Sequence, residues 1–128
     1  MEYIWPALAV VLAIHEEQVA EHGGSLGLRD PGLLDAALHR PLNYLSFGDN
    51  PDIALLAAVL GHGLVSNHPF IDGNKRVSLV ATELFLELNG YELVADDAVA
   101  VTTWLDLAQG NIDEQALAVW IRERIKAK

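Results

Sequence analysis

The sequence predicts an all-α protein, a compact single domain of about six helices that covers residues 1–128. Hydrophobic residues make up 52% of the 128 residues, which is enough to bury a core in a domain of this size. Apolar residues recur at helical spacing along most of the chain, whereas alternating, strand-like segments are almost absent. Pro, Gly and Asp residues divide the chain into apolar segments joined by short loops, as in helix bundles.

The first predicted helix has Pro6 at its first helical position and runs to about His22, where Gly23 and Gly24 end it. Its apolar run, residues 3–14, is too short to span a bilayer and follows no Lys or Arg of the kind that a signal peptide carries. We therefore expect a core helix of a cytoplasmic protein.

The second predicted helix starts at the capping residue Asp30, followed by Pro31, and is expected to end before Pro41. Residues 41–50 combine turn-forming and aromatic residues, so they are predicted to form a loop or a small flap that could dock a target. Residues 52–67 are apolar on nearly every side, which is typical of the central, buried helix of a bundle.

Three further helices are predicted in the second half of the chain, at residues 74–89, 96–110 and 113–126. Gly90 and Gly110 end the first two, while Asp96 and Asp113 cap the starts of the last two. Residues 91–94 are predicted to be a short connector, either irregular or a single strand. The last turn of the sixth helix carries basic residues that suit the negative end of a helix dipole, namely Arg122, Arg124 and Lys126.

The composition restricts the classes of partner. The formal net charge is −10 and the sequence pI is about 4.7. Such an acidic surface repels nucleic-acid backbones and anionic membranes, so neither is expected as a direct partner, whereas a basic protein segment would be attracted. The chain has no cysteine, which excludes disulfides and thiolate metal sites and fits a reducing compartment.

Residues 68–76, His-Pro-Phe-Ile-Asp-Gly-Asn-Lys-Arg, lie between the two predicted helices at the centre of the bundle. Gly73 and Asn74 open a helix whose first N–H groups lack intrahelical partners, which favours an anion site, above all for phosphate. Lys75 and Arg76 add two cations beside it, and an Arg can hold a phosphate through two parallel hydrogen bonds.

The same segment holds two residues suited to catalysis. Asp72 is the one acidic residue among these donors, and beside phosphate oxygens a carboxylate suits Mg²⁺. The imidazole of His68 can accept a proton from an attacking hydroxyl, as a general base does, while Phe70 is expected to anchor the loop in the core. Each residue alone has a structural explanation, such as a capping His or an Asp-Gly turn. Their combination within nine positions favours phosphoryl or nucleotidyl transfer.

This segment resembles the signature of the Fic/Doc family, His-x-Phe-x-Asp/Glu-Gly/Ala-Asn-Gly/Lys-Arg, at every specified position. Lys75 is similar to the Doc branch, since most Fic adenylyltransferases carry Gly there. Residues 23–37 also resemble the opening of Doc-like chains, so the resemblance covers nearly the whole sequence. Many Fic motifs continue with a second Arg, and Leu79 in its place again favours the Doc-like interpretation.

The resemblance implies a Fic/Doc fold with the catalytic loop between two central helices, and an enzyme that uses ATP and Mg²⁺. His68 would be the general base, Asp72 would hold Mg²⁺, and residues 73–76 would bind the nucleotide phosphates. Doc toxins transfer the γ-phosphate of ATP to a threonine of elongation factor Tu and so halt translation, and a Phd-type antitoxin controls them. The implied function is the toxin of a toxin–antitoxin system, a protein Ser/Thr kinase.

Two alternatives remain open from the sequence. A Fic-type adenylyltransferase would bind the nucleotide in the opposite sense and transfer AMP, and Lys75 and Leu79 count against it. A non-catalytic binding module could keep the same fold, but the intact His68 and Asp72 count against that. The target, the antitoxin, the oligomeric state and the nucleotide orientation are not determined by the sequence.

Overall fold

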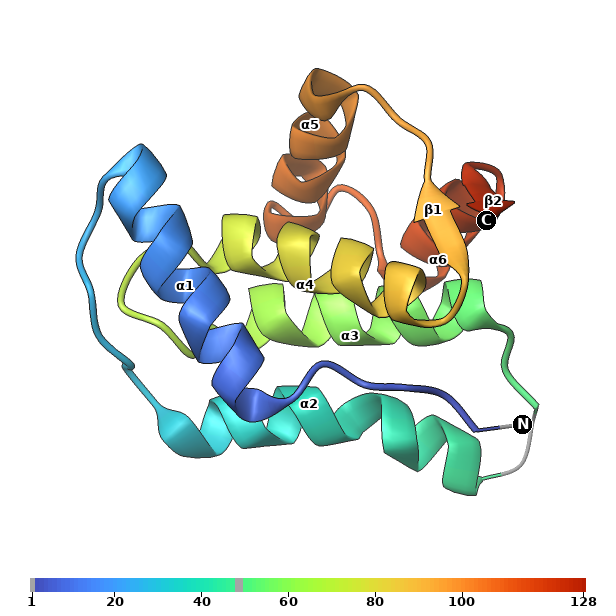
Figure 1. The fold of residues 1–128 in the computed structure, drawn as a ribbon, viewed down its shortest axis with the longest axis horizontal. Coiled ribbons are helices and arrows are strands. Elements are labelled where there is room, and N and C mark those ends of the chain that lie inside the picture. The colour runs from blue at the N-terminus through green and yellow to red at the C-terminus, as the bar shows by residue number, and fades with distance from the viewer. Residues whose placement is uncertain (1, 48–49) are drawn as a thin grey trace.

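Helix α3 (Ile53–Asn67) lies at the centre of the computed structural model, which describes residues 2–47 and 50–128. It is apolar on all sides, and most of its residues are buried between α2, α4 and α6. Figure 1 shows α3 between α2 and α4. The prediction that residues 52–67 form the central helix of an all-α fold is therefore confirmed.

The other elements, in chain order, are α1 (Leu8–His22), α2 (Pro31–Ser46), α4 (Asn74–Leu88), β1 (Tyr91–Leu93), α5 (Asp97–Ala108), α6 (Glu114–Arg122) and β2 (Ile125–Ala127). Helices α2, α4, α5 and α6 contact α3, whereas α1 and β1 pack on α4 (Figure 1). Asp30 and Asp113 begin helices as the sequence predicts, and Asp52, which is not predicted as a cap, does the same: each accepts a hydrogen bond from the backbone N–H three residues later. The side chain of Asp96 makes no such bond at the start of α5.

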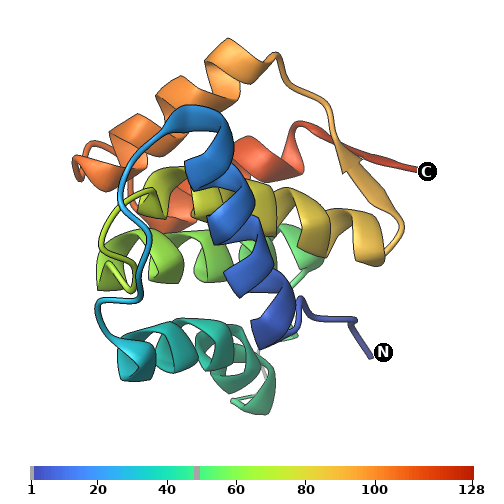
Figure 2. The same cartoon turned by 60° about the vertical axis from the view of Figure 1, so that its left-hand side comes forward.

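Helix α1 crosses the outside of α4 rather than entering the core (Figures 1 and 2). Only Val11 and His15 of this helix are buried, so the expectation of a core helix is wrong for most of its length. The helix begins at Leu8, so Pro6 precedes the helix instead of occupying its first position. No helix in the described ranges is both long enough and apolar enough to cross a membrane.

Helix α2 continues through Pro41 to Ser46, so the predicted helix end before Pro41 and the predicted loop over 41–46 are wrong. Pro41 is buried, and α2 packs along α3 where Ala37 lies close to Gly63. This packing outweighs the single helical hydrogen bond that a proline cannot donate. Part of the predicted 41–50 flap, residues 48–49, lies outside the described residues.

The C-terminus forms a strand where the sequence predicts the end of a helix. Helix α6 stops at Arg122, and β2 pairs antiparallel with β1 in the register Tyr91↔Ala127. The strand interpretation of residues 91–94 is thus confirmed, while the helical interpretation beyond Arg122 is wrong. Pairing with a strand more than 30 residues away is a non-local contact that helical periodicity cannot reveal.

A polar cluster joins α2, α3 and α6. Glu114 is 8% exposed and accepts hydrogen bonds from Arg40 and from the Tyr44 hydroxyl, the latter at 2.6 Å. His62 lies 3.4 Å from the same carboxylate. The hydrogen bond to Glu114 and burial together raise the pKa of Tyr44. This cluster satisfies a buried charge and ties the three helices together.

Candidate active site

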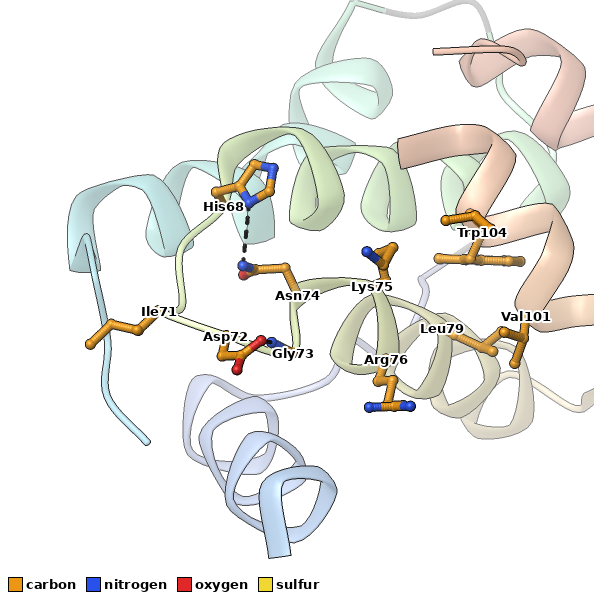
Figure 3. Close-up of a pocket in the computed structure, with 11 residues that line it drawn as sticks. His68, Ile71, Asp72, Gly73, Asn74, Lys75, Arg76, Leu79, Val101 and Trp104 are labelled. Atoms are coloured by element: carbon orange, nitrogen blue, oxygen red, sulfur yellow. Dashed lines mark hydrogen bonds between the residues drawn. The ribbon is translucent and has the colours of Figure 1, made fainter. Parts of the chain in front are cut away.

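The loop between α3 and α4 borders a cavity of about 440 Å³. Residues of the predicted 68–76 segment supply one side of this cavity, and Figure 3 shows His68, Asp72, Asn74, Lys75 and Arg76 around it. The opposite wall is apolar and comes from α4 and α5, with Leu79, Val101, Trp104 and Leu105. The structure therefore brings together all the polar residues that the sequence singles out.

The start of α4 presents unpaired donors to this cavity. Gly73 is the N-cap and takes φ +81°, a left-handed conformation that glycine adopts without strain. Within residues 2–47 and 50–128, the backbone N–H groups of Asn74, Lys75 and Arg76 donate to no hydrogen-bond acceptor. The Lys75 and Arg76 side chains are exposed and form no salt bridge within those ranges. These groups can hold an anion such as a phosphate.

The Asn74 side chain, in contrast, is used inside the loop. It is 8% exposed, and its Oδ1 accepts from the Phe70 N–H while its Nδ2 donates to the Phe70 carbonyl, both at 2.9 Å. These two bonds fix which way the amide points and close the loop on itself. The group that Asn74 can offer a phosphate is therefore its backbone N–H rather than its side chain.

His68 occupies an unusual backbone position at the end of α3. It has φ +47° and ψ +54°, the left-handed region, and its side chain is exposed at the cavity. Its Nδ1 lies 3.4 Å from the Asn74 Nδ2, a long contact that Figure 3 shows as a dashed line. The imidazole is thus held at the rim of the cavity, where it can meet an incoming hydroxyl group.

Phe70 and the main chain of Asp72 fix the loop to α1. Phe70 is 1% exposed and stacks on His15, with ring centroids 4.0 Å apart and planes 14° apart. The same His15 donates from Nε2 to the Asp72 carbonyl at 2.9 Å, which requires the proton on that nitrogen. His15 therefore supports both the apolar anchor of the loop and the backbone of its carboxylate residue.

The Asp72 carboxylate is oriented by two backbone donors. Its Oδ1 accepts from the Gly73 N–H at 2.9 Å, and its Oδ2 accepts from the Ser25 N–H at 3.3 Å. The part of the chain that the structure describes holds no cluster of three His, Cys, Asp or Glu side chains suited to a metal ion. A single carboxylate beside phosphate-binding donors nevertheless fits Mg²⁺, which binds through one or two carboxylates, substrate phosphates and water.

Residues 24–30 support the loop in a way that the sequence alone does not reveal. The Ile71 N–H donates to the Gly27 carbonyl at 3.1 Å, and Leu28 pairs with Phe70 in an isolated antiparallel bridge. A Cβ built on Gly24 would lie 2.7 Å from the Asp72 Oδ2, so the carboxylate can occupy its position only because residue 24 is glycine. The glycines of this segment are the one signal in the sequence that could have indicated a close backbone contact.

Comparison with known proteins agrees with this geometry. Residues 5–86 match the sequence model of the Fic/DOC family. The chain belongs to the Fic/DOC family. This Fic/DOC protein is 45% identical over 75 residues to "Toxin Doc" of Mycolicibacterium smegmatis, a match that spans 58% of each chain and so less than two thirds of that relative. It is 28% identical over 112 residues, 88% of each chain, to "Protein kinase doc" of Escherichia phage P1.

Proposed function

We propose that the protein is the toxin of a toxin–antitoxin system and transfers the γ-phosphate of ATP to a Ser or Thr hydroxyl of a translation factor. The observation that carries the proposal is the presence, around one cavity, of His68, the Asp72 carboxylate and the unpaired donors at the start of α4. The names of the two relatives, a toxin and a protein kinase, support the same assignment. Elongation factor Tu is the proposed target because the sequence resembles Doc toxins.

Each residue of the site has a separate role in the proposed reaction. The N–H groups of α4, with Lys75 and Arg76, bind the ATP phosphates. Asp72 would hold Mg²⁺, which neutralises charge on those phosphates. His68 accepts the proton of the target hydroxyl as its oxygen bonds to the γ-phosphorus. The bond from that phosphorus to the β–γ bridging oxygen breaks, the bridging oxygen keeps the electron pair, and ADP leaves.

The partners follow from the same proposal. A toxin of this kind acts in the cytoplasm and is controlled there by a Phd-like antitoxin, whose disordered tail would fold across it. The formal charge of −10 favours a basic antitoxin segment and disfavours nucleic acid as a direct partner.

The test is a transfer assay with purified elongation factor Tu, Mg²⁺, and ATP labelled at either the α- or the γ-phosphate. We expect label on the target from the γ-position alone, and no label with His68→Ala. Label from the α-position would mean AMP transfer, the Fic-type activity, and would contradict the interpretation of Lys75 as a sign of Doc-like γ-phosphate transfer. Equal transfer by His68→Ala would refute general-base catalysis. No label from either position would direct the search to other targets, and the absence of nucleotide binding even at millimolar ATP, with binding of a partner peptide alone, would favour a non-catalytic binding module.

A further inference from the structure

We propose that Arg29 is a positioning residue for His68, acting through the main chain at the end of α3. Its Nε donates to the His68 carbonyl at 2.7 Å and its Nη2 donates to the Asn67 carbonyl at 2.9 Å. Its own backbone N–H donates to the Pro69 carbonyl at 2.8 Å. One residue therefore holds three consecutive carbonyls, two of them at a helix end where no intrahelical donor reaches them.

His68 needs such a restraint because of its backbone conformation. A residue in the left-handed region just after a helix is usually glycine, since a Cβ there approaches the carbonyl oxygen. Only His68 and Asn50 combine a side chain with positive φ in the described ranges. Without the guanidinium, His68 can relax toward an ordinary conformation, and its imidazole then leaves the rim of the cavity.

The position of Arg29 separates this role from phosphate binding. Arg29 does not line the cavity, and two of its guanidinium nitrogens are directed at carbonyl oxygens. The proposed phosphate donors lie beyond the loop, on α4. Loss of the guanidinium should therefore lower the rate of proton acceptance by His68 and leave the affinity for ATP nearly unchanged.

The remaining contacts keep the segment in place when the side chain is changed. The backbone N–H groups of Arg29 and Asp30 both donate to the Pro69 carbonyl, at 2.8 and 3.0 Å. The Asn67 Nδ2 donates to the Leu33 carbonyl at 3.0 Å and so fixes the end of α3 to α2. A substitution of the Arg29 side chain therefore removes only the two guanidinium bonds, and a folded protein is expected.

The experiment compares Arg29→Met, Arg29→Lys and the control Arg124→Met. Arg124 also donates to a carbonyl near a helix end, that of Trp120 in α6, and does not line the cavity. For γ-phosphate transfer, which rests on the proposed function, Arg29→Met should lower kcat roughly 10- to 100-fold while KM for ATP changes less than about twofold. Arg29→Lys, with one donor group, should recover part of the loss, and the control should match the wild type.

Nuclear magnetic resonance supplies a readout that does not depend on transfer. The His68 ring and backbone signals, assigned with His68→Ala, should shift or broaden in Arg29→Met and stay unchanged in Arg124→Met. Unchanged signals with an unchanged kcat would overturn the proposal, and so would a raised KM for ATP with an unaltered kcat. If the wild type transfers no phosphate, the proposed function fails by itself, while the His68 signals still decide the role of Arg29.

Discussion

Substitution of Gly24 by Ala tests whether the 24–30 segment sets the position of the Asp72 carboxylate. Gly24 has φ +113°, and a Cβ there would lie 2.7 Å from the Asp72 Oδ2, closer than real Cβ atoms approach an oxygen. The carboxylate must therefore move, and its bond from the Ser25 N–H is lost. Gly23 provides a matched control, since it has φ +80° but no atom within 4 Å of a built Cβ.

The expected magnitudes differ between the two variants. Backbone strain at a non-glycine residue in this region costs about 1–3 kcal/mol, so Gly23→Ala should lose about that much stability. Gly24→Ala should lose about 1–2 kcal/mol more, because a hydrogen bond to a charged group is also broken. For a domain of this size each kcal/mol corresponds to about 3–5 °C in Tm. Displacing the carboxylate should further weaken Mg²⁺-dependent ATP binding roughly 10- to 100-fold.

The assay is isothermal titration with ATP in the presence and absence of Mg²⁺, beside thermal unfolding of both variants. Gly23→Ala should bind Mg²⁺ and ATP as the wild type does, whereas Gly24→Ala should lose the contribution of Mg²⁺. If Gly24→Ala binds like the wild type, or if both variants lose affinity equally, the contact between residue 24 and Asp72 does not position the carboxylate and the reasoning is refuted.

Three further substitutions test other parts of the structure. Asp52→Asn keeps the N-cap of α3 but loses the Arg122 pair, which is the main cause that lowers the pKa of Asp52. The stabilisation by the Asp52–Arg122 pair is present above the ordinary pKa of 3.8 and is lost as the pH falls through the lower folded-state pKa of Asp52. Because both side chains are about half exposed, the substitution should cost under about 1 kcal/mol of stability at pH 7. In thermal melts, this difference from the wild type should disappear in strong acid. Glu114→Gln should cost about 1–3 kcal/mol in urea unfolding, since it leaves the partly buried Arg40 unpaired, and a neutral result would show that the ion pair contributes nothing net. Asn74→Ala should cost about 2–4 kcal/mol in the same assay, because it breaks both bonds that close the loop, and little loss would mean that water replaces them.

The helical core was predictable because its signals are local. Residues 52–67 are apolar all round, and Asp30 and Asp113 cap helices from the positions where the sequence places them. The misplaced boundaries depend on distant contacts. Helix α2 continues past Pro41 because the proline ring is buried in the bundle. Residues 125–127 form a strand because they pair with β1. Neither contact leaves a periodic pattern in the sequence.

The site was predictable as a set of residues but not as a structure. The 68–76 segment is continuous, so the sequence alone groups the residues that the structure places around one cavity. The residues that hold it come from elsewhere: His15 lies 57 positions from Asp72, and Arg29 lies 39 positions from His68. A buried His in an apolar helix and an Arg after a Gly-rich run have many ordinary structural explanations, so only the folded chain reveals these contacts.

The polar groups of the loop form two sets, and this division would allow the proposed site to bind the phosphates of a nucleotide without a change in the loop. One set is engaged within the protein: the Asn74 amide binds Phe70, and the Asp72 carbonyl binds His15. The other set, the first N–H groups of α4 with the side chains of Lys75 and Arg76, lacks partners in the described ranges. Because the first set fixes the backbone, the N–H groups at the start of α4 are oriented before any ligand arrives, whereas the exposed Lys75 and Arg76 side chains stay free to adjust. Donors oriented in advance lose little energy to reorganisation when charge develops during phosphoryl transfer, which is the condition for electrostatic catalysis.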